Sequence, residues 1–184
     1  RTADIAGSDN QISIPLTTPI TITDSGVVAA ADVDAAVNDT NFTGLVTISS
    51  NATSLSGTLA IVTSVLDDDL AGTPKVDGST ALAITLTDTN ITAAEQKALD
   101  AKTTGAITAT ISDTDDTELN KLTGTGHALT IVANDATFTA TELIAYDAAT
   151  TLPVTFGTTF ATITGTATDI INTLNSSGFG AFPS

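Results

Sequence analysis

The sequence of 184 residues contains no cysteine, methionine or tryptophan, and aromatic residues make up only 4% of it. The lack of cysteine excludes disulfide bonds, thiolate metal sites and a cysteine nucleophile. With so few aromatic side chains, a core must be built mainly from Ala, Val, Ile and Leu, which favours a narrow core of small repeating layers. No run of 18 apolar residues occurs, so we predict no membrane-spanning helix.

Basic residues are also scarce, with 5 Lys and Arg against 21 Asp and Glu and a net charge of −16. Such a surface repels phosphate backbones and anionic lipids, so we predict no nucleic-acid partner and no membrane insertion. Strong acidity is common in proteins that stay soluble in salty surroundings, where charges are screened over about 8 Å at 0.15 M salt.

Threonine, by contrast, makes up about a fifth of the chain, and it belongs to a recurring pattern between Ala81 and Gly178. Each unit has a strand-like run, an Asp or Asn, a helix start and a short helix. The strand-like runs span residues 81–88, 106–113, 128–135 and 160–165, and they are rich in Thr and aliphatic residues.

The helix starts share one chemical signature, the capping box, in which a Ser, Thr or Asp is followed three residues later by Glu. Three such pairs are Thr92 with Glu95, Asp115 with Glu118, and Thr139 with Glu142, and Thr166 or Thr168 with Asp169 begins a fourth helix. One apolar face per helix is expected to be buried. Its residues are Ile91, Ala94, Ala98 and Leu99, then Leu119 and Leu122, then Leu143, Ile144 and Ala148, and finally Ile170, Ile171 and Leu174.

A unit of roughly 22 to 30 residues cannot bury its own apolar face and must stack on its neighbours. We therefore predict a β-rich α/β solenoid with parallel strands and short connecting helices, right-handed as such crossovers nearly always are. Ile84, Ile107 or Ile111, Ile131 and Ile163 should then point into one shared core. An all-β sandwich is the alternative.

The chain divides into an extended N-terminal arm (1–19), a repeat solenoid (20–178) and a C-terminal cap or tail (179–184). In the early part, residues 20–24 are predicted to form a strand and residues 28–37 its helix. Residues 45–50 form a second strand, with 51–57 as its connection. Residues 59–66 are interpreted as a continuous apolar strand followed by a loop without a helix, which makes an irregular turn near 55–80.

The unit from Ile91 to Gly105, followed by residues 106–114 and 119–126, resembles the Ala/Thr-rich strand–helix repeats of large cyanobacterial and proteobacterial cell-surface or secreted proteins. The resemblance implies an extracellular location and a structural or adhesive role. It carries over no functional residues.

On these grounds we expect a non-catalytic extracellular structural protein: a surface-layer, fibre or filament subunit, or a stiff adhesin spacer. The alternative is a binding module for carbohydrate, ice or calcium, with surface polysaccharide as a partner of its recurring Thr-x-Thr pairs. Catalysis is not expected, because no Gly-x-Ser-x-Gly motif is present and His127, the single imidazole, is predicted to lie at the surface or in a turn.

Two clusters of carboxylates are candidates for a calcium site, and no other cofactor is expected. They are Asp67, Asp68 and Asp69, and Asp113, Asp115 and Asp116. Calcium takes six to eight oxygen ligands, but no Asp-x-Asp-x-Asp-Gly loop ending in Glu occurs. We therefore favour solvated turn and helix-cap acids over a cation site.

The two ends of the chain carry the candidate assembly residues. Ile12, Ile14 and Leu16 alternate with polar residues as in a strand, whereas Phe179 and Phe182 lie in a segment without periodicity, where they would cap the last layer. Because a solenoid ends in open strand edges and apolar layers, we predict head-to-tail self-association through these ends.

Overall fold

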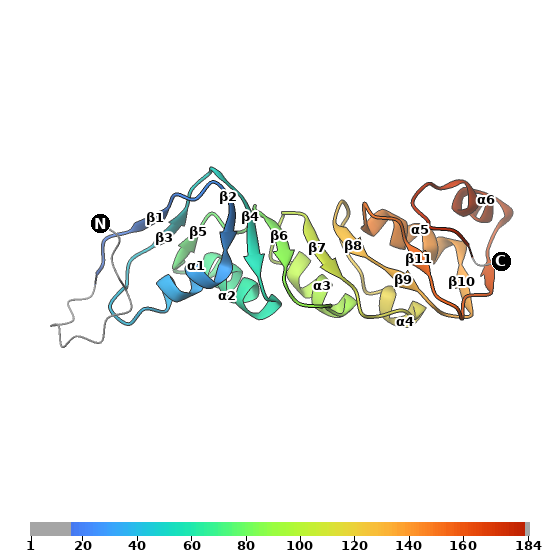
Figure 1. Ribbon diagram of the computed structural model, residues 1–184, viewed down its shortest axis with the longest axis horizontal. Coiled ribbons are helices and arrows are strands. Elements are labelled where there is room, and N and C mark those ends of the chain that lie inside the picture. The colour runs from blue at the N-terminus through green and yellow to red at the C-terminus, as the bar shows by residue number, and fades with distance from the viewer. Residues whose placement is uncertain (1–15, 183–184) are drawn as a thin grey trace.

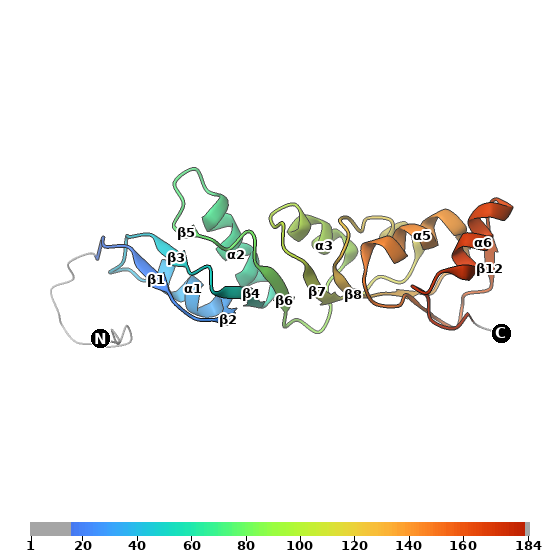
Figure 2. The ribbon, with the colours of Figure 1, turned by 90° about the horizontal axis from the view of Figure 1, so that it is seen from above.

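The computed structural model describes residues 16–182, which form an elongated α/β fold of parallel strands and short helices (Figure 1). The two ends of the described chain lie at opposite ends of the long axis in both ribbon views (Figure 1, Figure 2). The strands are β1 (Ile20–Ile22), β2 (Gly26–Ala29), β3 (Val46–Ile48), β4 (Ala52–Gly57), β5 (Val76–Asp77), β6 (Ala83–Leu86), β7 (Ile107–Thr110), β8 (Ala128–Thr130), β9 (Val132–Ala133), β10 (Thr137–Thr139), β11 (Thr155–Phe156) and β12 (Thr162–Thr164). The helices are α1 (Ala30–Val37), α2 (Leu59–Leu70), α3 (Ala93–Asp100), α4 (Asp116–Leu119), α5 (Ala140–Ala149) and α6 (Ala167–Asn175).

All strand pairs in residues 16–182 are parallel, as the sequence predicts. The longest sheet has the order β2-β4-β6-β7-β8, a second has β1-β3-β5, and two further sheets pair β9 with β11 and β10 with β12. Paired residues lie 20 to 30 positions apart, as for Ala109 with Leu129 and Val46 with Val76. Each strand therefore pairs with the corresponding strand of the next unit.

The core is a stack of aliphatic side chains contributed by these paired positions. Val28 pairs with Leu55, Leu55 with Ile84, and Ile84 with Ile107, and all four are buried. Because side chains alternate along a strand, the adjacent positions point outward, and they carry Val27 and Ala29 in β2, Ser54 and Ser56 in β4, Thr85 in β6 and Thr108 in β7. Of the predicted core residues, Ile84, Ile107, Ile111 and Ile131 are buried, whereas Ile163 is only partly buried against the core.

The predicted helix starts are present. Thr92 with Glu95 and Thr139 with Glu142 form the reciprocal capping box at α3 and α5. Asp115 and Thr166 cap α4 and α6 by accepting from the backbone N–H three residues on. Helices α2, α3 and α5 lie on one side of strands β4, β6, β7 and β8 (Figure 2).

Neighbouring units are joined at their helices as well as at their strands. Helix α1 packs on α2, α3 on α4, and α5 on α6. The carboxylate of Asp88 accepts a hydrogen bond from the N–H of Leu59, the first residue of α2, at 2.5 Å. Asp113 does the same for Ala93, the first residue of α3, at 2.7 Å. An acid in one unit thus satisfies the helix start of the preceding unit, where backbone N–H groups lack helical partners.

The structure corrects the interpretation of residues 51–80. The predicted apolar strand 59–66 is wrong, because Leu59–Leu70 forms α2, whose start is capped by Thr58 accepting from the N–H of Ile61. Residues 52–57, interpreted as a connection, form β4. The irregular turn near 55–80 is therefore part of a complete strand–helix unit, followed by a loop.

Two further expectations are corrected by the pairing pattern. The first residues of the predicted helix 28–37 belong to β2, so that α1 begins at Ala30. The all-β sandwich is wrong, because the strands alternate with helices and pair in parallel with later units. Across residues 16–182, the helices are all too short or too polar to cross a lipid bilayer.

Candidate functional site

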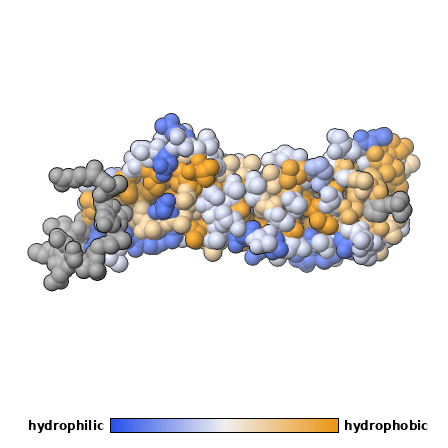
Figure 3. Space-filling view, in the orientation of Figure 1, coloured by the Kyte–Doolittle hydropathy of each residue, from blue (hydrophilic) through white to orange (hydrophobic). Residues whose placement is uncertain are grey.

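Four of the seven exposed large hydrophobic side chains in residues 16–182 lie in the first and last units. In the first unit Leu16 is 50% and Val27 is 64% exposed, and in the last unit Ile171 is 56% and Leu174 is 55% exposed. Figure 3 shows hydrophobic residues gathered over the C-terminal end of the array. The other three exposed large hydrophobic residues in the described chain are Leu70, Ile144 and Leu152. Apolar surface of this kind commonly marks an interaction site.

Helix α6 has the sequence of a helix with a buried face, yet that face is open. The prediction that Ile171 and Leu174 are buried is wrong. Of the apolar faces predicted for the earlier helices, Ile91, Leu99, Leu119 and Leu143 are buried as expected, but the same prediction is wrong for Ala94, Ala98, Ile144 and Ala148, which are exposed. Thr173, which is fully buried, faces α5, where its hydroxyl donates to the carbonyl of Ala140 at 3.4 Å. The outer face of α6 is exposed because no later unit covers it within residues 16–182.

Residues 179–182 lie over the last layer. Phe179 and Phe182 lie beside Phe156, with ring centroids 6.0 and 4.6 Å away. The N–H of Val154 donates to the carbonyl of Gly178, and the carbonyl of Val154 accepts from Gly180, both at 2.8 Å. Both phenylalanines are therefore half-buried in their own subunit and are less available for contacts than the exposed residues of α6.

The N-terminal candidates are described only in part. Ile12 and Ile14 lie outside the described residues. Leu16 forms an isolated parallel bridge with Phe42, and its carbonyl accepts from the N–H of Thr43 at 3.0 Å. Within the described chain β1 and β2 are edge strands at this end, and β12 is an edge strand at the other.

Charge is scarce at the C-terminal end, where residues 150–182 contain one charged side chain, Asp169. The first unit is more acidic, with Asp24 near β2, Asp32 and Asp34 on α1, and Asp39 after it. Residues 67–118 carry eleven of the 21 acids. A contact through the C-terminal end of one molecule would therefore bring together fewer like charges than a contact through its middle.

The calcium candidates have other partners in the structure. Asp69 accepts hydrogen bonds from the backbone and hydroxyl of Ser79 and from the N–H of Thr80, and Asp67 forms an ion pair with Lys102. Asp68 lies between them on α2. Asp113 and Asp115 cap α3 and α4, and Asp116 accepts from the hydroxyl of Thr117 at 3.3 Å. Within residues 16–182 no three His, Cys, Asp or Glu side chains are grouped closely enough to hold a metal ion. The calcium site stays a prediction.

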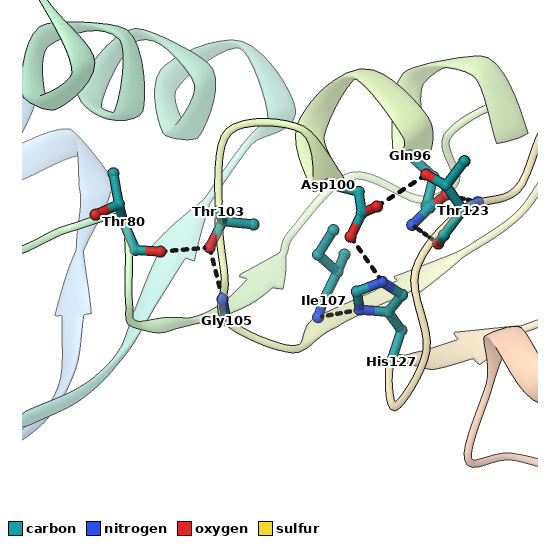
Figure 4. A network of polar contacts seen from close by, with 8 residues as sticks. All are labelled: Thr80, Gln96, Asp100, Thr103, Gly105, Ile107, Thr123 and His127. Atoms are coloured by element: carbon teal, nitrogen blue, oxygen red, sulfur yellow. Dashed lines mark hydrogen bonds and ion pairs between the residues drawn. The ribbon is translucent and has the colours of Figure 1, made fainter.

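His127 is buried rather than at the surface, which corrects the sequence-based expectation, and it lies in a polar network between two units (Figure 4). Its Nδ1 accepts from the N–H of Ile107 at 3.1 Å, so the ring proton lies on Nε2, 3.0 Å from Asp100. The other oxygen of Asp100 accepts from the hydroxyl of Thr123 at 2.9 Å. The Gln96 amide completes the network by donating to the carbonyl of Thr123 and accepting from its N–H.

This network holds the chain in place and lacks the arrangement of a hydrolytic triad, because the Thr123 hydroxyl is bound to Asp100 and not to His127. Gly124 leaves the space that the side chains of His127 and Asp100 occupy. A Cβ at Gly124 would lie 2.3 Å from Nε2 of His127 and 2.6 Å from the Asp100 carboxylate, and the backbone φ of +76° is unfavourable for other residues.

A second polar cluster surrounds α5. The Tyr146 hydroxyl donates to the side chain of Asn120 at 3.2 Å, and burial, together with the charge of Glu142, raises the pKa of this phenol. Partial burial acts to raise the pKa of Glu142, but hydrogen bonds from the backbone and side chain of Thr139 and from Asn120 outweigh it, so the pKa lies below its ordinary value.

Exposed threonines on neighbouring strands pair with each other, as the Thr-x-Thr pattern suggests. Thr137 pairs with Thr162 and Thr139 with Thr164 between β10 and β12. No charged residue occurs in β2, β4, β6, β7 or β8, so the longest sheet has an uncharged outer row of Ala, Ser, Thr and Val.

A small cavity of about 160 Å³ lies near the first unit, lined by Val37, Phe42, Thr43, Gly44 and Lys75. Pockets for organic ligands usually measure about 300–1,000 Å³, so this cavity is too small to suggest one. Comparison of the chain with protein-family models, with curated proteins and with solved structures gives no significant match.

Proposed function

We propose that the protein is a non-catalytic structural protein of an extracellular surface, built as an open right-handed solenoid that serves as a fibre or surface-layer subunit or as a stiff spacer. The observation that carries this proposal is the succession of parallel, in-register contacts between consecutive units, from the Leu16–Phe42 bridge to the Val154–Phe179 bridge. A rod made in this way contacts only its neighbours and can be lengthened without changing its cross-section.

The polar side chains support a structural role. The acids that would be candidates for general acid–base chemistry cap helices or join units, as Asp88, Asp113 and Glu142 do. His127, the single imidazole, is bound on both ring nitrogens. These groups are used to hold consecutive units together.

The extracellular location rests on composition and resemblance. The strong acidity and high threonine content suit a surface exposed to salt, and the strand–helix units resemble repeats of large bacterial surface proteins. Proteome-wide labelling of intact cells of the source with a membrane-impermeant reagent tests this point. Labelling only after lysis would contradict the extracellular assignment.

We further propose that subunits associate head to tail, because the edge strands β2 and β12 and the exposed residues Val27, Ile171 and Leu174 lie at the two ends, and the last unit carries little charge. Sedimentation and small-angle scattering of the full chain should show particles longer than one subunit, increasingly so at about 1 M salt, where the screening length falls to about 3 Å. A chain that stays monomeric at high concentration and high salt would contradict assembly and favour the spacer.

A second candidate function is binding to a surface polysaccharide or to ice through the paired, exposed threonines of β10 and β12. Thr139 and Thr164 are adjacent across these strands, with hydroxyl and methyl groups at a strand spacing of about 4.8 Å. Co-sedimentation with insoluble polysaccharide and measurement of thermal hysteresis test this candidate. The variant Thr137→Asp should abolish either effect, and absence of both effects in the unchanged chain would remove the candidate.

A further inference from the structure

We propose that the exposed face of α6, formed by Ile171 and Leu174, is the binding site for the first strand–helix unit, β2 and α1, of a second copy of this chain. The inference rests on the proposed head-to-tail association and identifies the two surfaces that meet. It assigns the contact to α6 in place of Phe179 and Phe182.

Helix α6 lacks a neighbouring helix on its outer side in the described chain. Neighbouring units place a helix on a helix, as α1 on α2 and α5 on α6. Counted from the helix caps, Ile171 corresponds to Ile144 of α5, which is 36% exposed with α6 packed beside it. Ile171 and Leu174, with no later helix beside them in the described chain, are 56% and 55% exposed. The surface formed by Ile171 and Leu174 is therefore suited to packing against another strand–helix unit.

The unit that can cover α6 is the first unit of another copy. The first unit of the same molecule cannot cover α6, because the two ends lie at opposite extremes of the long axis (Figure 1, Figure 2). The first unit of another copy fits by order: β2 directly precedes α1, as β12 directly precedes α6, and both strands are edges. Its exposed Val27 is apolar. On α1, Asp32 and Ala36 occupy the positions that match Asp169 and Thr173 of α6, the side of that helix that faces the preceding helix.

The strand direction fixes how two copies can meet. All strand pairs in the described chain are parallel, so a copy that continues the ladder must have the same orientation as the first. Two like ends could meet only with their strands antiparallel. The contact is therefore heterologous and does not close, which leads to a filament and not to a two-fold dimer.

The two surfaces differ in charge. The last unit offers only Asp169, whereas the first unit has Asp24 near β2 and Asp32 and Asp34 on α1. Asp32 is exposed, and Asp34 accepts from the hydroxyl of Ser64 on α2. The contact thus buries few charges and keeps some repulsion between acids, so that salt should strengthen it. The aromatic residues of the last unit are already used, since Phe182 stacks on Phe156 within its own subunit.

The experiment uses two full-length variants that block one end each. Ile171→Asp with Leu174→Asp blocks the tail, Val27→Asp blocks the head, and Leu70→Asp is the matched control, because Leu70 is 55% exposed but lies in the second strand–helix unit, away from both proposed contact surfaces. Circular dichroism checks that each variant is folded. In analytical ultracentrifugation at about 1 M salt, each blocked variant alone should need at least about tenfold higher concentration to associate, whereas the control should match the unchanged chain.

Mixing the two blocked variants gives the decisive result. Each retains one working end, so the mixture should form a one-to-one dimer and nothing longer. A head-blocked variant that still dimerises alone would overturn the heterologous contact, and a tail-blocked variant that assembles normally would overturn the assignment to α6. If the unchanged chain never associates, the proposed assembly itself fails, and this outcome is distinguishable from the other two.

Discussion

The middle of the array and its C-terminal end join their units in different ways. In the middle, polar side chains cross between units: Asp100 to His127, Gln96 to Thr123, and Asp113 to the start of α3. At the C-terminal end the contacts are aromatic, since all the phenylalanines except Phe42, and the single tyrosine, lie between residues 138 and 182.

The same strand–helix backbone therefore accepts two kinds of contact between units. The two kinds should respond differently to substitution of a contacting side chain. A buried polar junction costs free energy whenever one partner is removed, because the other is left without a hydrogen bond. An aromatic junction depends on buried area and packing, so its cost scales with the volume removed. The following changes test whether the two regions respond in these ways.

The largest effect is expected at the aromatic junction. Phe138 is fully buried, 6.1 Å from Tyr146 and 5.9 Å from Phe160 between ring centroids. Phe138→Ala should lower the free energy of unfolding by about 3–5 kcal/mol, because it leaves a cavity. Denaturant titration measures the loss, and hydrogen exchange should rise in α5 and α6 but not in β2 and β4, because units contact only their neighbours.

Phe182→Ala is the control for this change, because Phe182 belongs to the same cluster at its half-buried rim. It should cost well under half as much. Equal losses for the two substitutions would mean that the cluster acts as a surface cap and not as a packed core.

A smaller loss is expected at the polar junction. His127→Ala leaves both the N–H of Ile107 and the carboxylate of Asp100 without this partner, so it should cost about 1–3 kcal/mol. A double-mutant cycle with Asp100→Ala should give a coupling energy of about 0.5–3 kcal/mol. Additive losses would contradict the network, and Thr108→Ala, at an exposed position of β7, should change little.

The sequence predicted a contact where both partners lie close together in the chain. The capping boxes of Thr92 and Thr139 were predictable, because both partners lie within four residues. Helix α2 was missed because Ile61, Val62 and Val65 are β-branched and favour strands, although the cap residue Thr58 was a usable signal.

Contacts between units were not predictable, because they join residues more than 20 positions apart. Nothing adjacent to His127 indicates that Asp100 and Ile107 will enclose it. The pattern in α6 did predict an apolar face, but exposure of Ile171 and Leu174 depends on whether a further unit follows. A sequence pattern gives the face of a helix, whereas the neighbouring units decide whether it is covered.

A modest, pH-dependent effect is expected at the capping box of α5. The folded pKa of Glu142 lies below its ordinary value of 4.5, so ionised Glu142 stabilises the folded state above that pH, and this contribution is lost as the pH falls through the folded pKa. Glu142→Gln keeps the capping geometry without the charge. Compared with this variant, the unchanged chain should lose about 0.5–1 kcal/mol more between pH 7 and pH 3. Equal pH dependence would show that the charge of Glu142 contributes nothing.

The smallest effect is expected from calcium, which tests whether the acids of the middle serve as junctions or as a cation site. Calcium prefers six to eight oxygens, but Asp69 already accepts three hydrogen bonds, and Asp113 and Asp115 cap helices. To bind the ion, these carboxylates would have to give up contacts that hold α3, α4 and the loop before β6. We therefore expect the melting temperature to be the same in several millimolar calcium as in chelator. A rise that is lost in Asp68→Asn would establish a site on α2, and one lost in Asp116→Asn a site at α4. Either result would mean that the middle of the array is joined by a metal ion as well as by hydrogen bonds.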